Sequence, residues 1–169
     1  MTLANRESVY GPILVAAFTN VGLPPEWGMA IARQESAFKP AVINNTGGDA
    51  LRGGSRGLCQ MSLKTARALG FVGDPDLLFQ PVLNAQLAAK LCLSLTRQFK
   101  TAELKDIAAG YNSGKPFARC PASTVAYANN VVAYAAAYKE RARALASGLL
   151  HQSAVAALAP VGVPVAAII

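Results

Sequence analysis

Apolar residues recur along most of this chain at the three- and four-residue spacing that is typical of amphipathic helices. Proline, serine, threonine and glycine stand at positions where such helices begin and end. Together these signals predict helices over about 11–21, 24–38, 62–70, 81–99, 101–113 and 121–146. The clearest apolar stripe recurs every four residues: Leu83, Leu87, Leu91, Leu95 and Phe99. The pattern therefore predicts an all-α protein.

The segment 41–56 breaks this helical pattern. It contains the pairs Asn44-Asn45, Gly47-Gly48 and Gly53-Gly54, which are typical of irregular backbone. Loops of this length in a compact domain often carry function. We therefore expect a long irregular loop between the second and third helices.

The C-terminal segment 148–169, called the tail below, is a second exception because it contains no Lys, Arg, Asp or Glu. Its apolar part before Pro160 is too short to span a bilayer. We expect one domain over 1–147, followed by a tail that folds back on the domain or is loosely ordered. Contact of the tail with a membrane or a partner is the alternative.

The composition supports one helical domain of ordinary size. A chain of 169 residues, 53% of them apolar, can bury a hydrophobic core. Only 7% of the residues are aromatic, which favours packed helices over a β-sandwich. The net charge of +7 suits an anionic partner such as nucleic acid, a membrane surface or an acidic cell-wall polymer. Because no dense cluster of Lys and Arg is present, nucleic acid is not the partner we expect.

The cysteines and the single histidine, His151, lack the spacing of a zinc site, so we expect no bound metal. We expect Cys59, Cys92 and Cys120 to be buried free thiols. A Cys92–Cys120 disulfide is the alternative.

Glu35 is the first candidate for chemistry. It is expected one turn beyond Ile31, close to the end of the second helix and facing the polar loop. Desolvation in such a place can raise the pKa of a carboxyl, which can then donate a proton to a leaving oxygen. Asp49 lies in the loop and could activate water from the other side of a cleft. A loop or capping role is the simpler interpretation of Asp49.

Four short segments provide a context for Glu35. In chain order they are IARQESAFKP at 31–40, GLCQM at 57–61, AGYNSG at 109–114 and TVAY at 124–127. In this order they resemble the signature of the soluble lytic transglycosylase family of the lysozyme superfamily. That signature has a Glu-Ser pair followed by an aromatic residue and a proline, then Gly-Leu-Met-Gln, Ala-Tyr-Asn-x-Gly and Thr-x-x-Tyr. The resemblance covers about 25–135 and implies a single lysozyme-like helical domain.

The sequence departs from the family pattern at two positions in these segments. Cys59 stands where methionine is usual, which exchanges one apolar sulfur side chain for another. Gly110 stands where alanine is common.

The resemblance also implies roles for individual residues. Glu35 matches the catalytic glutamate, and Ser36 matches a serine that positions it or the acetamido group of the sugar. Tyr127 matches a tyrosine that hydrogen-bonds the glutamate. The remaining matches are residues that contact the glycan or its peptide stem, or that lie beside the cleaved bond: Gln60, Met61, Tyr111 and Asn112.

The implied activity is cleavage of the β-1,4 bond between MurNAc and GlcNAc in peptidoglycan, with a 1,6-anhydroMurNAc product and no cofactor. The alternative is a muramidase that hydrolyses the same bond with Glu35 and Asp49, as goose-type lysozymes do. A third hypothesis is a non-enzymatic helical module that binds peptidoglycan or nucleic acid through its basic surface.

The resemblance also suggests a biological setting. The first ten residues contain Arg6 and Glu7 and no apolar run, so we expect no signal peptide. We expect a monomer of the phage endolysin or virion-associated type, made in the cytoplasm and delivered to the periplasmic cell wall by release or injection. The tail is the segment that could contact a membrane.

Overall fold

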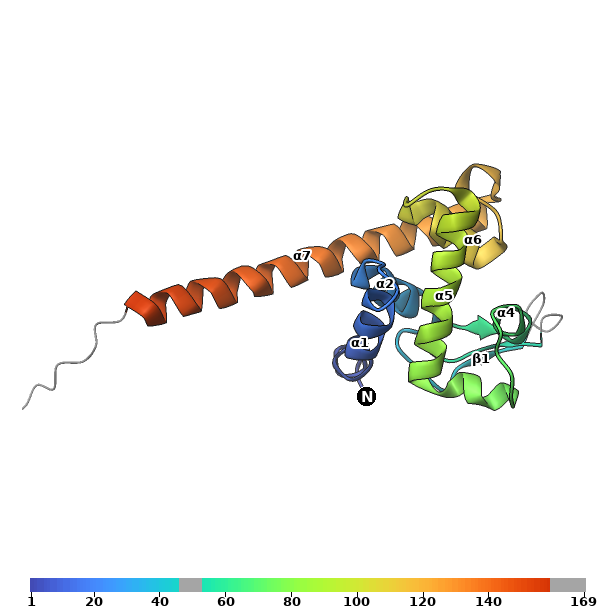
Figure 1. The fold of residues 1–169 in the computed structure, drawn as a ribbon, viewed down its shortest axis with the longest axis horizontal. Coiled ribbons are helices and arrows are strands. Elements are labelled where there is room, and N and C mark those ends of the chain that lie inside the picture. Colours follow the sequence, from blue (N-terminus) through green and yellow to red (C-terminus); the bar gives the residue numbers. More distant parts are fainter. Residues whose placement is uncertain (46–52, 159–169) are drawn as a thin grey trace, which may run out of the picture. The chain divides into compact units, whose positions relative to one another are not determined.

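The computed structural model describes residues 1–45 and 53–158 of the chain. It divides into two compact units, Met1–Tyr138 and Lys139–Ile169. The helices and strands are α1 (Leu3–Thr19), α2 (Pro25–Ser36), β1 (Ile43–Asn44), β2 (Ser55–Arg56), β3 (Met61–Ser62), α4 (Leu63–Ala68), η1 (Pro75–Phe79), α5 (Pro81–Phe99), α6 (Leu104–Ser113), η2 (Phe117–Arg119) and α7 (Ala122–Leu158) (Figure 1). The all-α prediction is confirmed. Asp49 and the tail from residue 159 lie outside the described residues, and the domain boundary at residue 147 stays a prediction.

Helix α1 begins eight residues earlier than the sequence pattern predicts. Its N-terminus is capped by Thr2, whose side chain accepts a hydrogen bond of 3.2 Å from the backbone N–H of Asn5. Pro12 therefore lies inside the helix and not in its first turn. The helix tolerates this proline because Pro12 and Ser8 are exposed, so water can reach the Ser8 carbonyl that loses its helical partner.

Helix α2 ends at Ser36, two residues before the predicted end at Phe38. The cause is two consecutive residues in the left-handed region, Ala37 with φ of 50° and Phe38 with φ of 59°. The N–H of Phe38 donates to the carbonyl of Ala32, as in a Schellman motif. The ring of Phe38 is fully buried, and burial of this ring stabilises the sharp turn directly after Glu35.

A small antiparallel sheet lies within and after the segment that was expected to be irregular. Strands β1, β2 and β3 pair in that order, with Ile43 opposite Arg56 and Ser55 opposite Ser62. The prediction of a wholly irregular 41–56 is therefore wrong at 43–44 and 55–56. Two-residue strands are too short to show the alternation of apolar and polar residues on which strand prediction rests.

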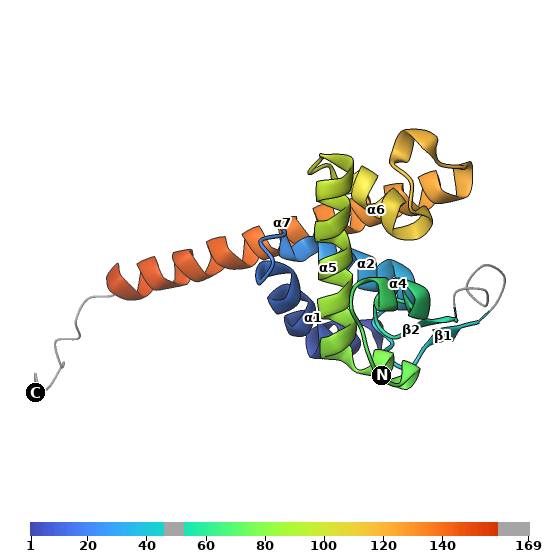
Figure 2. The ribbon, with the colours of Figure 1, turned by 45° about the vertical axis from the view of Figure 1, so that its right-hand side comes forward.

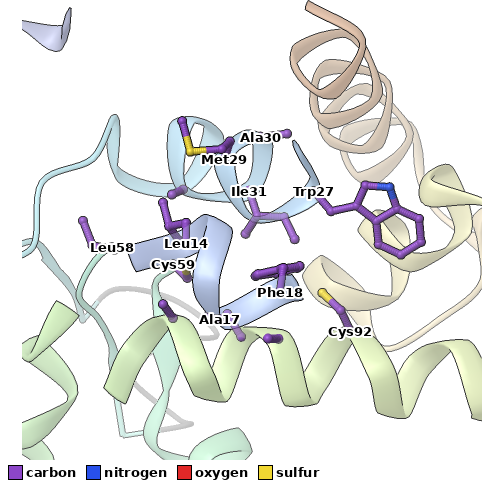
Figure 3. Close-up of a cluster of buried hydrophobic side chains, with 14 of the residues drawn as sticks. Leu14, Ala17, Phe18, Trp27, Met29, Ala30, Ile31, Leu58, Cys59 and Cys92 are labelled. Atoms are coloured by element: carbon purple, nitrogen blue, oxygen red, sulfur yellow. The ribbon is translucent and has the colours of Figure 1, made fainter. Parts of the chain in front are cut away.

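The hydrophobic core lies where α1, α2 and α5 pack together (Figures 1 and 2). Figure 3 shows Leu14 and Phe18 of α1 beside Ile31 of α2, with Cys92 of α5 below them. Leu58 reaches the same cluster from the segment between β2 and β3. The segments 31–40 and 57–61 contribute Ile31, Leu58 and Cys59 to this core and are therefore anchored on it.

The remaining helices occur where the sequence predicts them, although the ends of α6 and α7 differ. Ser62 caps α4 as predicted, by accepting a hydrogen bond of 3.1 Å from the N–H of Thr65. Helix α6 begins at Leu104, slightly after the expected cap at Thr101, and it ends at Ser113 with Gly114 as its C-cap, as expected. Helix α7 extends beyond its predicted end at 146. None of the described helices is both long enough and apolar enough to cross a membrane.

All three cysteines are free. Cys59 and Cys92 are buried, as expected, whereas Cys120 is partly exposed. The alternative Cys92–Cys120 disulfide is therefore not formed in the structure.

Candidate active site

A cavity of about 220 Å³ opens between the C-terminal end of α2, the small sheet and the C-terminal half of α6. Five of the residues expected at the site line this cavity: Glu35, Gln60, Met61, Tyr111 and Asn112. The sheet and its neighbours contribute further lining residues that the sequence did not indicate: Val42, Asn44, Ser55, Ser62, Thr65 and Leu91. Among the described residues of this lining, Glu35 is the only acidic one.

Glu35 is half-buried and accepts a hydrogen bond from Tyr127. The phenol oxygen of Tyr127 lies 2.5 Å from Oε1 of Glu35, although the two residues are 92 positions apart in the chain. Burial raises the pKa of Tyr127 well above its usual value, and the nearby Glu35 charge and this hydrogen bond raise it further. The phenol therefore stays protonated and donates to the carboxylate, which orients the Glu35 carboxyl.

Ser36 lies beside Glu35 but does not line the cavity. Its hydroxyl donates to the carbonyl of Leu58 at 2.7 Å and accepts from the N–H of Lys39 at 3.1 Å. Ser36 thus ties the end of α2 to the segment that carries Gln60. In this geometry, the effect of Ser36 on Glu35 is exerted through the backbone.

The segment Gly57–Gln60 forms a tight turn next to the cavity. Gly57 has φ of +81° and Gln60 has φ of +46°, both in the left-handed region. The side-chain amide nitrogen of Gln60 donates to the carbonyls of Val42 and Gly57, each at 2.9 Å. Because both hydrogen bonds use the nitrogen, the amide oxygen is the part of Gln60 that can accept a hydrogen bond from a ligand.

Tyr111 and Asn112 project from the last turn and a half of α6. The hydroxyl of Tyr111 donates to the carbonyl of Cys59 at 2.7 Å, and burial raises the pKa of this phenol well above its usual value. Asn112 accepts a hydrogen bond of 2.9 Å from the hydroxyl of Thr124. The Thr-x-x-Tyr segment therefore supports the site at two points, because Thr124 holds Asn112 while Tyr127 holds Glu35.

Cys59 contributes packing to the site. Its thiol is fully buried, and burial raises its pKa, with a further contribution from the charge of Glu35. The neutral thiol fills the core next to the cavity and stays inert. In the described part of the chain, no three His, Cys, Asp or Glu side chains are grouped as a metal site would require.

Asn84 is a buried polar residue near the site that the sequence pattern did not reveal. It lies on α5 with no exposed surface, and its side chain contacts the Gly57–Gln60 turn. A polar residue on the core face of an otherwise apolar helix was the signal available in the sequence. That signal is weak without knowledge of which face of α5 is buried.

Comparison with known proteins places the chain in a family. A family model described as the Transglycosylase SLT domain matches residues 13–126. Among solved structures, an inactive glutamate-to-glutamine variant of the lytic transglycosylase Slt from Pseudomonas aeruginosa is 25% identical, with a TM-score of 0.65, over 79% of this chain and 24% of that one. A search of curated proteins finds no match.

Two further structures show the same fold. The 70 kDa soluble lytic transglycosylase from Escherichia coli is 26% identical, with a TM-score of 0.64, over 75% of this chain and 24% of that one. A complex of the 70 kDa soluble lytic transglycosylase with bulgecin A is 25% identical, with a TM-score of 0.63 and the same coverage. This chain thus spans about a quarter of the length of these proteins. Since the family model matches more than half of the chain, the chain belongs to the Transglycosylase SLT domain family.

Proposed function

We propose that this chain is a peptidoglycan lytic transglycosylase in which Glu35 is the single catalytic carboxyl. The observation that carries the proposal is the position of Glu35, which lines the cavity and is oriented by the neutral phenol of Tyr127. The similar solved structures support it, because they are described as lytic transglycosylases and a glutamate-to-glutamine variant of one of them is inactive.

The proposed reaction uses Glu35 first as an acid and then as a base. The Glu35 carboxyl protonates the glycosidic oxygen between MurNAc and GlcNAc, and the bond from C1 to that oxygen breaks. The N-acetyl carbonyl of the substrate stabilises the cationic C1. The Glu35 carboxylate then removes the proton of the MurNAc C6 hydroxyl, whose oxygen bonds to C1. The product is a 1,6-anhydro sugar, and no water is consumed.

One carboxyl is sufficient for this scheme because the proton that it gives up in the first step returns in the second. The described lining of the cavity agrees with that requirement, since Glu35 is its only acidic residue. The proposed substrate contacts are made by four other residues that line the cavity: Gln60, Met61, Tyr111 and Asn112. Ser36 and Tyr127 act from outside the lining, by holding the turn after α2 and the Glu35 carboxyl.

The setting that we propose is enzymatic lysis of a bacterial wall by a phage, as an endolysin or a virion enzyme. The net charge of +7 supports an action at the anionic wall and membrane surface. We further propose that the uncharged tail contacts the membrane. Flotation with zwitterionic lipid vesicles tests the tail, because such vesicles do not attract the basic domain; loss of flotation after removal of the tail is expected, and unchanged flotation would exclude its contact.

The test of the activity is mass spectrometry of products from purified peptidoglycan digested with the parent and with Glu35→Gln. We expect muropeptides that end in 1,6-anhydroMurNAc, and a loss of at least about a thousandfold in the variant, since acid–base catalysis is typically worth 10²–10⁴. Glu26→Gln is the matched control because Glu26 lies in the first turn of the same helix, away from the cavity. It should cleave like the parent.

Other products would decide between the remaining hypotheses. Reducing MurNAc ends, about 18 Da heavier by one water, would show hydrolysis and make Asp49 the next residue to test. Equal behaviour of the parent and Glu35→Gln, with binding but no cleavage, would show a binding module.

A further inference from the structure

Asn84 makes three hydrogen bonds through its side chain in a place that water does not reach. Its side chain has no exposed surface. Its amide oxygen accepts from the N–H of Cys59 at 2.8 Å, and its amide nitrogen donates to the carbonyls of Arg56 and Leu78, each at 2.8 Å. Both donor hydrogens of the amide and one acceptor site are therefore used, all with backbone groups. A buried amide without these partners would be costly, so the arrangement is strongly specified.

These partners place Asn84 at the turn that supports the site. Two of its hydrogen bonds lie on either side of Gly57, at Arg56 and Cys59. A Cβ atom at Gly57 would lie 2.6 Å from the amide nitrogen of Asn84 and 2.5 Å from the carbonyl oxygen of Leu78. Glycine at this position is thus what allows the amide to reach the backbone of the turn.

The turn that Asn84 holds is the backbone on which three site residues depend. Its carbonyls accept hydrogen bonds from the hydroxyl of Ser36, the hydroxyl of Tyr111 and the side-chain amide of Gln60. The turn also contains Gln60 with φ of +46°, a left-handed conformation that a residue other than glycine keeps only where the surroundings hold it. The backbone of Cys59 links Asn84 to Tyr111, because its N–H donates to Asn84 and its carbonyl accepts from Tyr111.

We propose that Asn84 is a positioning residue of this active site. It touches no substrate. It holds the Gly57–Gln60 turn in its left-handed form and thereby sets the positions of Gln60 and Tyr111 in the cavity. The proposal rests on the proposed function, because it assigns Gln60 and Tyr111 to substrate binding.

A positioning role differs from a purely structural role in its kinetic signature. A variant that is only less stable contains fewer folded molecules, which lowers the apparent kcat and leaves KM unchanged. A variant with a displaced turn is folded but presents Gln60 and Tyr111 wrongly, which raises KM. The two effects are separable when kcat and KM are measured on soluble peptidoglycan strands at temperatures below unfolding.

The experiment compares Asn84→Ala with Leu87→Ala. Leu87 lies on the same helix and is buried, but it faces α1 near Ala17 and Val21 and not the turn. We expect Asn84→Ala to raise KM by about tenfold, the effect of losing one good hydrogen bond to the substrate. Leu87→Ala should lower Tm and leave KM within about twofold of the parent. An unchanged KM for Asn84→Ala would overturn the proposal.

A second measurement does not depend on activity. Hydrogen exchange of the Cys59 N–H should be at least about tenfold faster in Asn84→Ala, relative to the amides of α5, because its acceptor is gone. Equal protection in parent and variant would also overturn the proposal. If Asn84→Ala does not fold, Asn84→Asp serves for the KM measurement, because it retains the acceptor for Cys59 and loses the donors to Arg56 and Leu78; an unchanged KM in that variant would overturn the proposal. An inactive parent with the expected exchange difference would reject the proposed function and retain the positioning of the turn.

Discussion

The hydrogen bond from Tyr127 to Glu35 gives the sharpest prediction about catalysis. Tyr127→Phe removes one oxygen atom and retains the ring, so the buried packing of α7 against the site is preserved. The bond that is lost spans 2.5 Å and ends on an ionisable carboxyl. Hydrogen bonds to charged groups contribute about 1.5–3 kcal/mol. Converted at about 1.4 kcal/mol per factor of ten, this corresponds to a fall in kcat of roughly 10- to 150-fold.

The pH dependence of the variant follows from the same bond. Burial and Glu35 raise the pKa of Tyr127 well above its usual value, so the phenol stays protonated throughout the working range and acts only as a donor. A donor stabilises the carboxylate form of its partner. Its removal should therefore move the basic limb of the kcat profile toward higher pH, because Glu35 enters the proposed reaction as the acid and without this donor keeps its proton to higher pH.

The assay is initial-rate release of anhydro-muropeptides from soluble peptidoglycan strands between pH 4 and 9, with Tyr134→Phe as the matched control. Tyr134 lies two turns further along α7, and its ring contacts the guanidinium of Arg33, with 4.6 Å from Cζ to the ring centroid. Phenylalanine preserves that ring contact, so the control should behave like the parent. A Tyr127→Phe enzyme with the parental kcat and the parental basic limb would refute the argument.

Three further predictions concern stability and reactivity. Gly57→Ala should destabilise the fold by about 3 kcal/mol or more, because φ is +81° and the added Cβ would meet atoms at 2.5 Å and 2.6 Å. Gly114→Ala, where φ is +74° and the space around the added Cβ is open, should cost about 1 kcal/mol. Urea unfolding measures both losses of stability, and equal losses would contradict the packing argument. A thiol reagent at pH 8 should label only Cys120 in the native protein, because Cys59 and Cys92 are buried, and it should label all three cysteines after denaturation. Fast labelling of a second thiol in the native protein would show that the structure around a buried cysteine opens readily. Burial raises the pKa values of four groups: Cys59, Cys92, Tyr111 and Tyr127. Because the unfolded chain releases these protons at lower pH than the folded chain does, the free energy of unfolding should be level up to about pH 8.5 and should then fall by up to about 1.4 kcal/mol per pH unit for each group. A level profile to pH 11 would contradict the raised pKa values.

Most of the helices could be predicted because their signals are local. A helix forms hydrogen bonds between residues four apart, and its apolar stripe and caps lie within the same short segment. The stripe of α5, the Ser62 cap of α4 and the stop at Gly114 are examples. The early start of α1 was missed because a proline is typical of the first turn of a helix. Pro12 can lie inside α1 because it is exposed, and exposure is a property of the folded protein that the sequence does not show.

The sequence also identified the residues of the candidate site through the order of four short segments. The spacing of these segments along the chain does not show, however, how far apart their side chains lie in the folded protein. The sequence could not show that Ser36 points to the carbonyl of Leu58 and away from the cavity. It gave no indication that Asn84, outside those segments, holds the turn of the second one.

By itself, the sequence determined the helical class, the candidate carboxyl and the set of side chains that accompany it. Tertiary structure alone decided which of them meet: the phenol of Tyr127 reaches Glu35 across 92 residues because the beginning of α7 packs near the end of α2. It also decided that two-residue strands form one wall of the cavity. The physical reason is the range of the forces, since helix hydrogen bonds act within one turn of the chain, whereas burial and side-chain hydrogen bonds join any surfaces that the fold brings together.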